Sequence, residues 1–400
     1  MSARREEGPL HASFTLGRVA GVEIGVNWSW IVIVGLVVWS LGATVFPDEV
    51  PGLSDGAYLA MALIAALAFF ASLLLHELGH AVVARREGME IEGITLWLFG
   101  GVARFKGMFP SAGAELRIAL AGPAVSLVLG LAFLGAAAAL PLPDAVDGVV
   151  EWLGRINLIL LAFNMLPALP LDGGRVLRAL LWLRSGDFTG ATAAAGALGR
   201  AFGNFLMIMG ALTLLLAGAL GGLWFIAIGF FLSAAAQAEV SFATTRSALA
   251  GLYVRDAMVT EPDRVDGDTS LAAFVSGPFA RSRHAAYPVE SDGALSGIFS
   301  YRAVAGVPPP DWDRVRVRDV AVPLGEVLTL SRDDPLAEAL MDLAESPLRR
   351  ALVLDDAGRL QGLLSITDVS RLLELERVRV SGFPRSGSAV STVPATRAGA

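Results

Sequence analysis

Two histidines and a glutamate lie close together near the end of an apolar segment, in the string His76-Glu77-Leu78-Gly79-His80. On a helix, residues i and i+4 share one face, so both imidazoles can reach one metal ion, with the carboxylate of Glu77 beside the first. A catalytic zinc ion usually takes three protein ligands and keeps one position for water. The spacing therefore predicts a zinc site that lacks one further protein ligand.

The best third ligand in the sequence is Asp172, in the segment Asn164-Met-Leu-Pro-Ala-Leu-Pro-Leu-Asp-Gly-Gly. Two prolines open the backbone there, and the two glycines allow close packing. The chain has no cysteine and four histidines, so His and carboxylate side chains must hold any metal. An ionisable residue in an apolar span costs about 2.5–3.5 kcal/mol on insertion scales, which favours a functional interpretation of His76 and His80.

The composition, 54% hydrophobic and 17% charged, is more apolar than that of an average soluble protein. Residues 1–246 hold 31 of the 69 charged residues, so the apolar part comes first. Uncharged runs predict six transmembrane helices: Ile24–Pro47, Gly56–His76, Ile118–Pro143, the shorter Ile156–Leu171, and two helices within Ala201–Ala238 separated by a glycine turn. No secretory signal is expected, because the first residues are charged.

Two features of the loops complete this membrane half. Met89–Phe105 alternates apolar and polar residues and predicts a membrane-associated β-hairpin that turns at Gly100-Gly101. Arg and Lys gather between the second and third spans and between the fourth and fifth, which places these loops and both termini in the cytoplasm. The sequence thus predicts a multi-pass protein of the cell membrane.

The part from Ser247 onward predicts a soluble α/β domain built from a duplicated module. Val254-Arg255-Asp256 recurs as Val317-Arg318-Asp319, and the stretch Gly293–Val304 recurs as Gly358–Val369. We therefore predict a membrane domain over 1–246, two modules over 251–310 and 314–380, and a disordered tail over 381–400. A net charge of -7 argues against a nucleic-acid partner.

The membrane half resembles the site-2 protease family of intramembrane zinc metalloproteases. The resemblance rests on His76-Glu77-x-x-His80, Gly100-Gly101, Ala121-Gly122-Pro123 and the segment from Asn164 to Gly174. It implies one zinc ion per chain held by His76, His80 and Asp172, with Glu77 as the catalytic base. Asn164, Gly100 and Gly101 are the candidates for positioning a single-span membrane protein substrate, although Asn164 could equally satisfy backbone opened by Pro167. Ser126 departs from the asparagine of many relatives and receives no role.

The duplicated module resembles a pair of cystathionine-β-synthase (CBS) domains, which implies an adenosine nucleotide as a second ligand and a homodimer formed through these domains. The second module keeps the Ser/Thr-x-x-Asp element as Ser365-Ile-Thr367-Asp368, whereas Arg302 stands near the matching place in the first. We therefore expect one nucleotide site, around Thr367 and Asp368, or a degenerate pair that only dimerises.

Two other functions are compatible with parts of this pattern. A membrane transporter or channel gated by the CBS pair would show corresponding broken helices in two repeats, and the sequence contains no such repeat. A protease without activity would more naturally lack Glu77 or a ligand. The sequence favours an active intramembrane zinc metalloendopeptidase that performs regulated intramembrane proteolysis.

Overall fold

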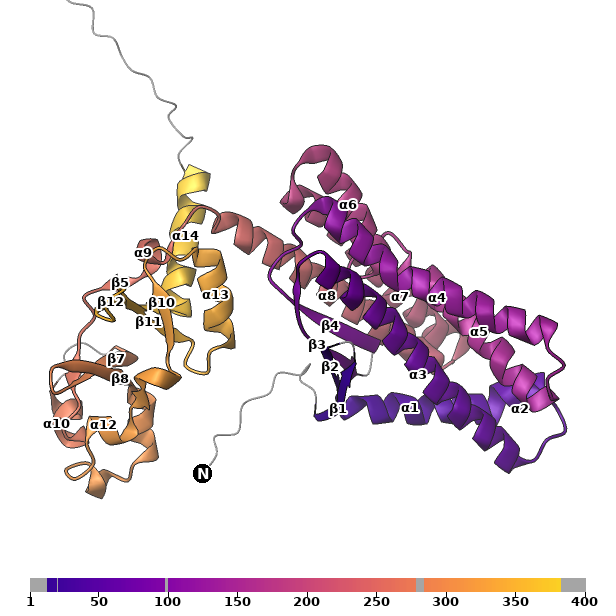
Figure 1. Cartoon of the computed structure of the whole chain (residues 1–400), viewed down its shortest axis with the longest axis horizontal. Helices are drawn as coiled ribbons and strands as arrows, with labels where there is room; N and C mark the ends of the chain where they lie inside the picture. Colours follow the sequence, from indigo (N-terminus) through magenta and orange to yellow (C-terminus); the bar gives the residue numbers. More distant parts are fainter. Residues whose placement is uncertain (1–12, 20, 98–99, 278–283, 383–400) are drawn as a thin grey trace, which may run out of the picture. The chain divides into compact units, whose positions relative to one another are not determined.

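The structure, a computed structural model, describes residues 13–19, 21–97, 100–277 and 284–382 (Figure 1). The chain divides into two compact units, Met1–Thr244 and Thr245–Ala400. The first unit is mainly helical and contains one small sheet, and the second has two small sheets with short helices.

Long apolar helices make up most of the first unit. Within the described residues, five helical segments are long and apolar enough to cross a membrane: Ser29–Glu49, which comprises α1 (Ser29–Ser40), a π-helical segment (Leu41–Val45) and α2 (Phe46–Glu49), then α3 (Asp55–Arg86), α4 (Ala112–Ala139), α7 (Phe188–Ala217) and α8 (Gly221–Ala248). Their outward side chains are apolar, as Trp39 and Leu216 illustrate with exposed fractions of 70% and 82%. This is the surface that a lipid environment requires.

The predicted fourth span corresponds to α5 (Asp144–Asn164) and a non-helical segment after it. The N-terminal part of α5 carries four charged residues, Asp144, Asp147, Glu151 and Arg155, so α5 is not among the five apolar segments. The chain resumes as α6 (Asp172–Ser185), a shorter helix that contacts α4 and α7.

Polar residues set the limits of the long helices. The Ser54 hydroxyl caps α3 by accepting a hydrogen bond from the Ala57 N–H. Arg85 and Arg86 in the last turn stabilise the C-terminal end of α3 through the helix dipole. At its other end, α7 terminates at Gly218, which adopts the left-handed conformation with φ 63°. The predicted glycine turn between the last two apolar helices is therefore confirmed.

A four-stranded sheet accompanies these helices. Its order is β1 (Phe14–Val19), β2 (Val22–Val26), β3 (Glu90–Trp97) and β4 (Gly100–Lys106), with β2 parallel to β3. The predicted hairpin is confirmed, but the turn at Gly100-Gly101 is wrong, because both glycines lie in β4 and Gly100 pairs with Trp97. The start of the first predicted span at Ile24 is also wrong, because Ile24 belongs to β2 and pairs with Ile94.

Helix α4 is central to the first unit, because it packs against α3, α5 and α6. In Figure 1, α3, α4 and α5 run side by side. One hydrophobic core of this unit contains buried residues of α3 and α5 and of the helical segment before α3, including Met61, Leu153 and Phe46. Because α4 contacts both α3 and α6, it connects the helix that carries the histidines to the helix that begins with Asp172.

The second unit contains two sheets of matching order, β6-β7-β8-β9 and β10-β11-β12-β5. The strands are β5 (Val259–Thr260), β6 (Val265–Asp266), β7 (Ala286–Ser291), β8 (Ala294–Ser300), β9 (Val322–Pro323), β10 (Leu328–Ser331), β11 (Arg350–Leu354) and β12 (Leu360–Ser365). The helices are α9 (Val254–Ala257), α10 (Leu271–Ser276), α12 (Val317–Val320), α13 (Leu336–Glu345) and α14 (Ile366–Gly382), with 3-10 turns at Tyr301–Gly306, Pro309–Asp311 and Leu324–Glu326.

The two repeats exchange their first strands. Strand β5 of the first repeat pairs with β12 of the second, and β9 of the second repeat pairs with β8 of the first. Each repeat therefore completes the sheet of the other, and the predicted module boundaries remain predictions. Residues 383–400 of the predicted tail lie outside the described residues, while residues 381–382 belong to α14.

Candidate metal centre

The two histidines of α3 lie one helical turn apart on a buried face. His76 is 2% exposed and His80 is 4% exposed, and their ring centroids are 4.9 Å apart. The chain reaches this point as a continuous helix, so the spacing of four residues is enough to bring both rings together. Two of the three predicted metal ligands are therefore brought together by local sequence.

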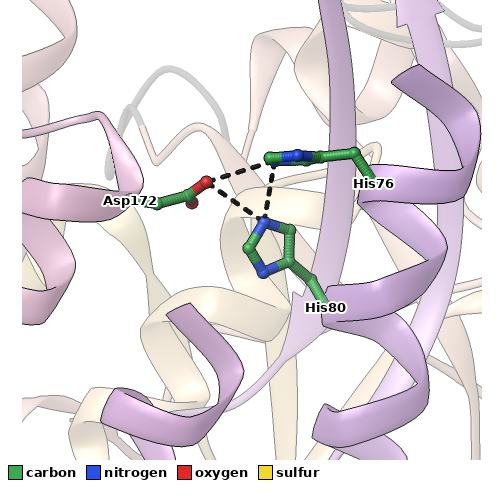
Figure 2. A group of neighbouring side chains, drawn as sticks. All are labelled: His76, His80 and Asp172. Carbon is green, nitrogen blue, oxygen red and sulfur yellow. Dashed lines mark hydrogen bonds and ion pairs between the residues drawn. The ribbon is translucent and has the colours of Figure 1, made fainter. Parts of the chain in front are cut away.

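Asp172 approaches the histidines from α6, of which it is the first residue (Figure 2). Its Oδ2 atom lies 3.2 Å from His76 Nε2 and 3.3 Å from His80 Nε2, and the two Nε2 atoms are 3.2 Å apart. The carboxylate is also buried, with 8% exposure. The three ligand atoms lie within 4.8 Å of one another. This donor set of two imidazoles and one carboxylate is the type that binds catalytic zinc.

The outer nitrogen of each histidine bonds to α4. His80 Nδ1 lies 2.7 Å from the carbonyl oxygen of Ile118, and His76 Nδ1 lies 2.9 Å from the hydroxyl of Ser126. A carbonyl only accepts, so His80 donates from Nδ1 and directs the lone pair of Nε2 toward Asp172. The orientation of the rings is what a metal ligand requires.

Gly122 leaves space beside the two Nε2 atoms. A Cβ atom at this position would lie 2.6 Å from His76 Nε2 and even closer to His80 Nε2. Helix α4 can approach the histidines this closely only because residue 122 has no side chain. The space that a side chain at residue 122 would fill therefore lies beside the two Nε2 atoms that would bind a metal ion.

Two glycines after Asp172 fix the start of α6 against the segment before it. A Cβ atom on Gly173 would lie 2.5 Å from the Leu166 carbonyl oxygen, and one on Gly174 would lie 2.6 Å from that of Ala168. This close approach was expected from the Asp-Gly-Gly string. It places the Asp172 carboxylate at the buried end of α6 that faces α3.

Glu77 lies next to strand β4. A Cβ atom on Gly101 would lie 2.6 Å from Glu77 Cγ, so the glycine allows the backbone of β4 to pass beside the carboxylate. Among the residues that the structure describes, no hydrogen bond or ion pair engages the Glu77 carboxylate. Gly100 begins β4 with φ 131°, a conformation that favours glycine.

Asn164 is the last residue of α5 and is half-buried. Within the described part of the chain its amide makes no hydrogen bond. The structure thus brings together His76, His80 and Asp172, with Glu77 and Gly101 beside them, whereas among the described residues no hydrogen bond or ion pair joins Asn164 to this group.

A buried ion-pair cluster anchors α6. The Arg178 guanidinium donates from Nε to Glu115 Oε1 of α4 at 2.7 Å and from an Nη atom to Glu239 Oε2 of α8 at 3.0 Å. Glu115 is fully buried and Arg178 is 3% exposed. The cluster ties the helix that begins with Asp172 to the two helices around it, and the sequence analysis did not identify it.

In the second unit, Thr367 and Asp368 lie in the first turn of α14. Asp368 Oδ2 accepts hydrogen bonds from the Ser365 N–H at 3.0 Å and from the Ser365 hydroxyl at 2.5 Å, which is a helix-capping arrangement. Thr367 is exposed and Asp368 is half-buried, so both remain accessible to solvent.

Comparison with known proteins agrees with this geometry. The profile of Peptidase family M50 matches residues 64–144 and 142–210, and that of the CBS domain matches residues 317–375. Over 374 residues, the chain is 40% identical to a protein of Mycobacterium tuberculosis named zinc metalloprotease Rip3, with 92% of this chain and 95% of that protein covered. The chain belongs to peptidase family M50.

The chain is also similar to two further proteins. A zinc metalloprotease of Synechocystis sp. is 31% identical over 91% of this chain and 96% of its own length. The solved structure of a site-2 protease from Methanocaldococcus jannaschii is 28% identical, covering 57% of this chain and 94% of that one with a TM-score of 0.42. The protein is thus a zinc metalloprotease of the site-2 protease type with membrane helices and a C-terminal CBS domain. Membership of a protease family sets aside the transporter or channel alternative.

Proposed function

We propose that this protease cleaves single-span membrane proteins within the bilayer, as the hydrolytic step of regulated intramembrane proteolysis. The observation that carries the proposal is the buried group of His76, His80 and Asp172, two of whose members lie on a helix able to cross a membrane. We also propose that α5 is a sixth span and that both termini face the cytoplasm. The Arg and Lys residues between α3 and α4 and between α5 and α7 support this orientation.

The residues of the centre divide the chemistry. His76, His80 and Asp172 would hold zinc, which when bound lowers the pKa of water to about 7 and polarises a carbonyl group. The Glu77 carboxylate is next to His76 and has no partner among the described residues. It can accept the proton of the attacking water and pass it to the nitrogen of the leaving amine.

Strand β4 is suited to hold the substrate. In the described sheet β4 is the last strand, so the side away from β3 is an edge, and Gly101 places this strand beside Glu77. A transmembrane helix hides its peptide bonds in its own hydrogen bonds and must be extended before cleavage. Main-chain pairing along the edge of β4, starting at Gly100 and Gly101, would hold the extended segment next to the base. Asn164, with both a donor and an acceptor, is a second candidate for binding the substrate main chain.

The test of proteolysis uses the full chain in proteoliposomes with a single-span test substrate. We expect cleavage inside the span of the substrate. We expect Glu77→Gln to abolish cleavage while the protein keeps its zinc, and Asp172→Ala to lower zinc occupancy and cleavage together. Cleavage by Glu77→Gln at the wild-type rate would contradict the role of this residue as the base.

The test of the edge exploits the absence of native cysteine from the sequence. A single cysteine at Arg104 of β4, in the Glu77→Gln background, is paired with cysteines scanned along the substrate. Extended pairing predicts cross-linking that alternates every second residue of the substrate. A cysteine at Arg18, which is 75% exposed on the opposite edge strand β1, is the matched control. Equal cross-linking from both edges would contradict the proposal.

We further propose that an adenosine nucleotide binds the CBS pair at one site, around Thr367 and Asp368. Burial lowers the pKa of the Arg350 guanidinium, and the nearby Arg302 lowers it further, whereas Asp368 acts in the opposite direction. Arg350, with a second arginine and a carboxylate in its surroundings, suits a ligand that carries both phosphate and ribose hydroxyls. Regulation of proteolysis by this ligand is part of the proposal.

Calorimetry of the full chain in detergent with ATP, ADP and AMP tests the nucleotide site. We expect binding of one nucleotide per chain that Asp368→Ala abolishes. Asp319→Ala is the matched control, because Asp319 caps α12 in the same way, accepting from the Arg316 N–H at 2.9 Å. If Asp368→Ala leaves binding unchanged, or no nucleotide binds, the pair has only a structural role. We expect the detergent-solubilised chain to be a homodimer by native mass spectrometry and to become monomeric when residues 251–382 are removed.

A further inference from the structure

The hydrogen bond of Ser126 distinguishes it from Ser72 and Thr192, two other buried hydroxyls on helices of the first unit. Ser72 donates to the carbonyl of Ala68 at 3.0 Å, and Thr192 donates to that of Phe188 at 2.7 Å, so each bonds to its own helix four residues earlier. Ser126 is fully buried on α4, and its hydroxyl instead bonds across to His76 of α3. A buried hydroxyl used in this way is aimed at the metal centre.

The two histidines differ in what their outer nitrogen can do. The Ile118 carbonyl only accepts, so it fixes His80 as the tautomer with hydrogen on Nδ1. A hydroxyl both donates and accepts, so Ser126 is compatible with either tautomer of His76. His76 Nε2 also lies 3.2 Å from Asp172 Oδ2 and can donate to it when the hydrogen is on Nε2.

We propose that Ser126 is a positioning residue that orients the ring of His76 and supports its metal-binding tautomer. In the ligand form, its hydroxyl accepts from Nδ1–H and leaves the lone pair of Nε2 for the metal. In the other form, the hydroxyl donates to Nδ1, and Nε2–H donates to Asp172. The inference rests on the proposed role of His76 as a zinc ligand, and it assigns a function to a residue that the sequence pattern left without one.

The face of α4 that carries Ser126 supports this role. Ile118, Gly122 and Ser126 are spaced by four residues, so they form one stripe along the helix. The stripe supplies a carbonyl to His80, a gap beside both Nε2 atoms and a hydroxyl to His76. Partners of metal-bound histidines at this distance typically change metal affinity by about 10- to 100-fold when removed.

The test measures zinc affinity of the full chain in detergent by competition with a chelator. We expect Ser126→Ala to weaken zinc binding by about 10- to 100-fold. Ser72→Ala, which deletes a hydroxyl of similar burial one turn before His76, should leave the affinity unchanged. If the cavity in Ser126→Ala prevents folding, Ser126→Cys keeps the volume and replaces the hydroxyl by a weak acceptor, and it should also weaken binding.

The tautomer is read directly by NMR of ¹⁵N-labelled histidine, because the chain has four histidines and two of them, His11 and His284, can be replaced. With both proteins zinc-free, we expect Ser126→Ala to carry more of the His76 hydrogen on Nε2 than the wild type does, because Asp172 Oδ2 accepts from Nε2–H while the acceptor for Nδ1–H is lost. Wild-type affinity and an unchanged His76 tautomer in both Ser126 variants would overturn the inference. A wild-type protein that binds no zinc would contradict the proposed metal site itself.

Discussion

Adding one methyl group at Gly122 should remove zinc without disrupting the fold. The new Cβ would lie 2.6 Å from His76 Nε2 and closer still to His80 Nε2. Carbon atoms and their neighbours are in favourable contact at about 3.5–4.0 Å, so each ring, or the whole of α4, must shift by about 1 Å. Metal sites tolerate only about 0.2 Å in ligand distances. The displacement is several times this tolerance.

Loss of a hydrogen-bond partner of a metal ligand typically weakens metal binding by about 10- to 100-fold. We expect Gly122→Ala to weaken zinc binding by more than about 100-fold and to abolish cleavage. Overpacking of this kind costs about 1–3 kcal/mol, so the variant should still insert and melt cooperatively. The assay is zinc content and affinity of the purified protein. Gly135→Ala is the control on the same helix, because its Cβ would have no neighbour within 4 Å. Zinc affinity of Gly122→Ala equal to that of Gly135→Ala would refute the reasoning.

Three further predictions concern packing and ligand linkage. Arg178→Gln leaves the fully buried Glu115 without its cation, so it should lower the free energy of unfolding in detergent by about 3–5 kcal/mol. The control, Arg117→Gln, breaks an exposed ion pair with Glu87 and should have no measurable effect on this free energy. Gly203→Ala places a Cβ 2.5 Å from the Gly229 carbonyl oxygen, which forces α7 away from α8 and should lower the free energy of unfolding by about 1–3 kcal/mol. Gly221→Ala is the control, because its Cβ would meet open space, and it should leave this free energy unchanged. Removal of zinc by a chelator should lower the melting temperature of the wild-type protein, because free metal at 100 times its Kd stabilises the folded state by about 2.7 kcal/mol. The melting temperature of His80→Ala should not change when the chelator is added.

The sequence predicted the donor set because its signals are local. His76 and His80 are four residues apart on one helix, and Asp172 stands out through the prolines before it and the glycines after it. The same holds for the hairpin, whose alternating residues form β3 and β4. In each case the residues that determine the structure are neighbours in the chain.

The features that were missed depend on contacts between distant residues. Ile24 reads equally well as the start of an apolar helix, and only its pairing with Ile94 makes it part of a strand. The sequence predicted a turn at Gly100-Gly101, but Gly101 lies in β4, where its lack of a side chain allows the strand to pass close to Glu77. Ser126 carries no pattern of its own, although its spacing of four from Gly122 and eight from Ile118 was a usable signal once α3 was known to face α4.

The most direct test of the central claim is zinc K-edge X-ray absorption of the purified wild-type protein. The account predicts one zinc ion per chain with two imidazole nitrogens at about 2.0–2.1 Å and oxygen ligands at about 2.0–2.2 Å, from His76, His80 and Asp172. In Asp172→Ala, the zinc occupancy of the protein should fall, and the zinc that remains should keep the imidazole signal. A protein without zinc, or a spectrum without two imidazole ligands, would contradict the account.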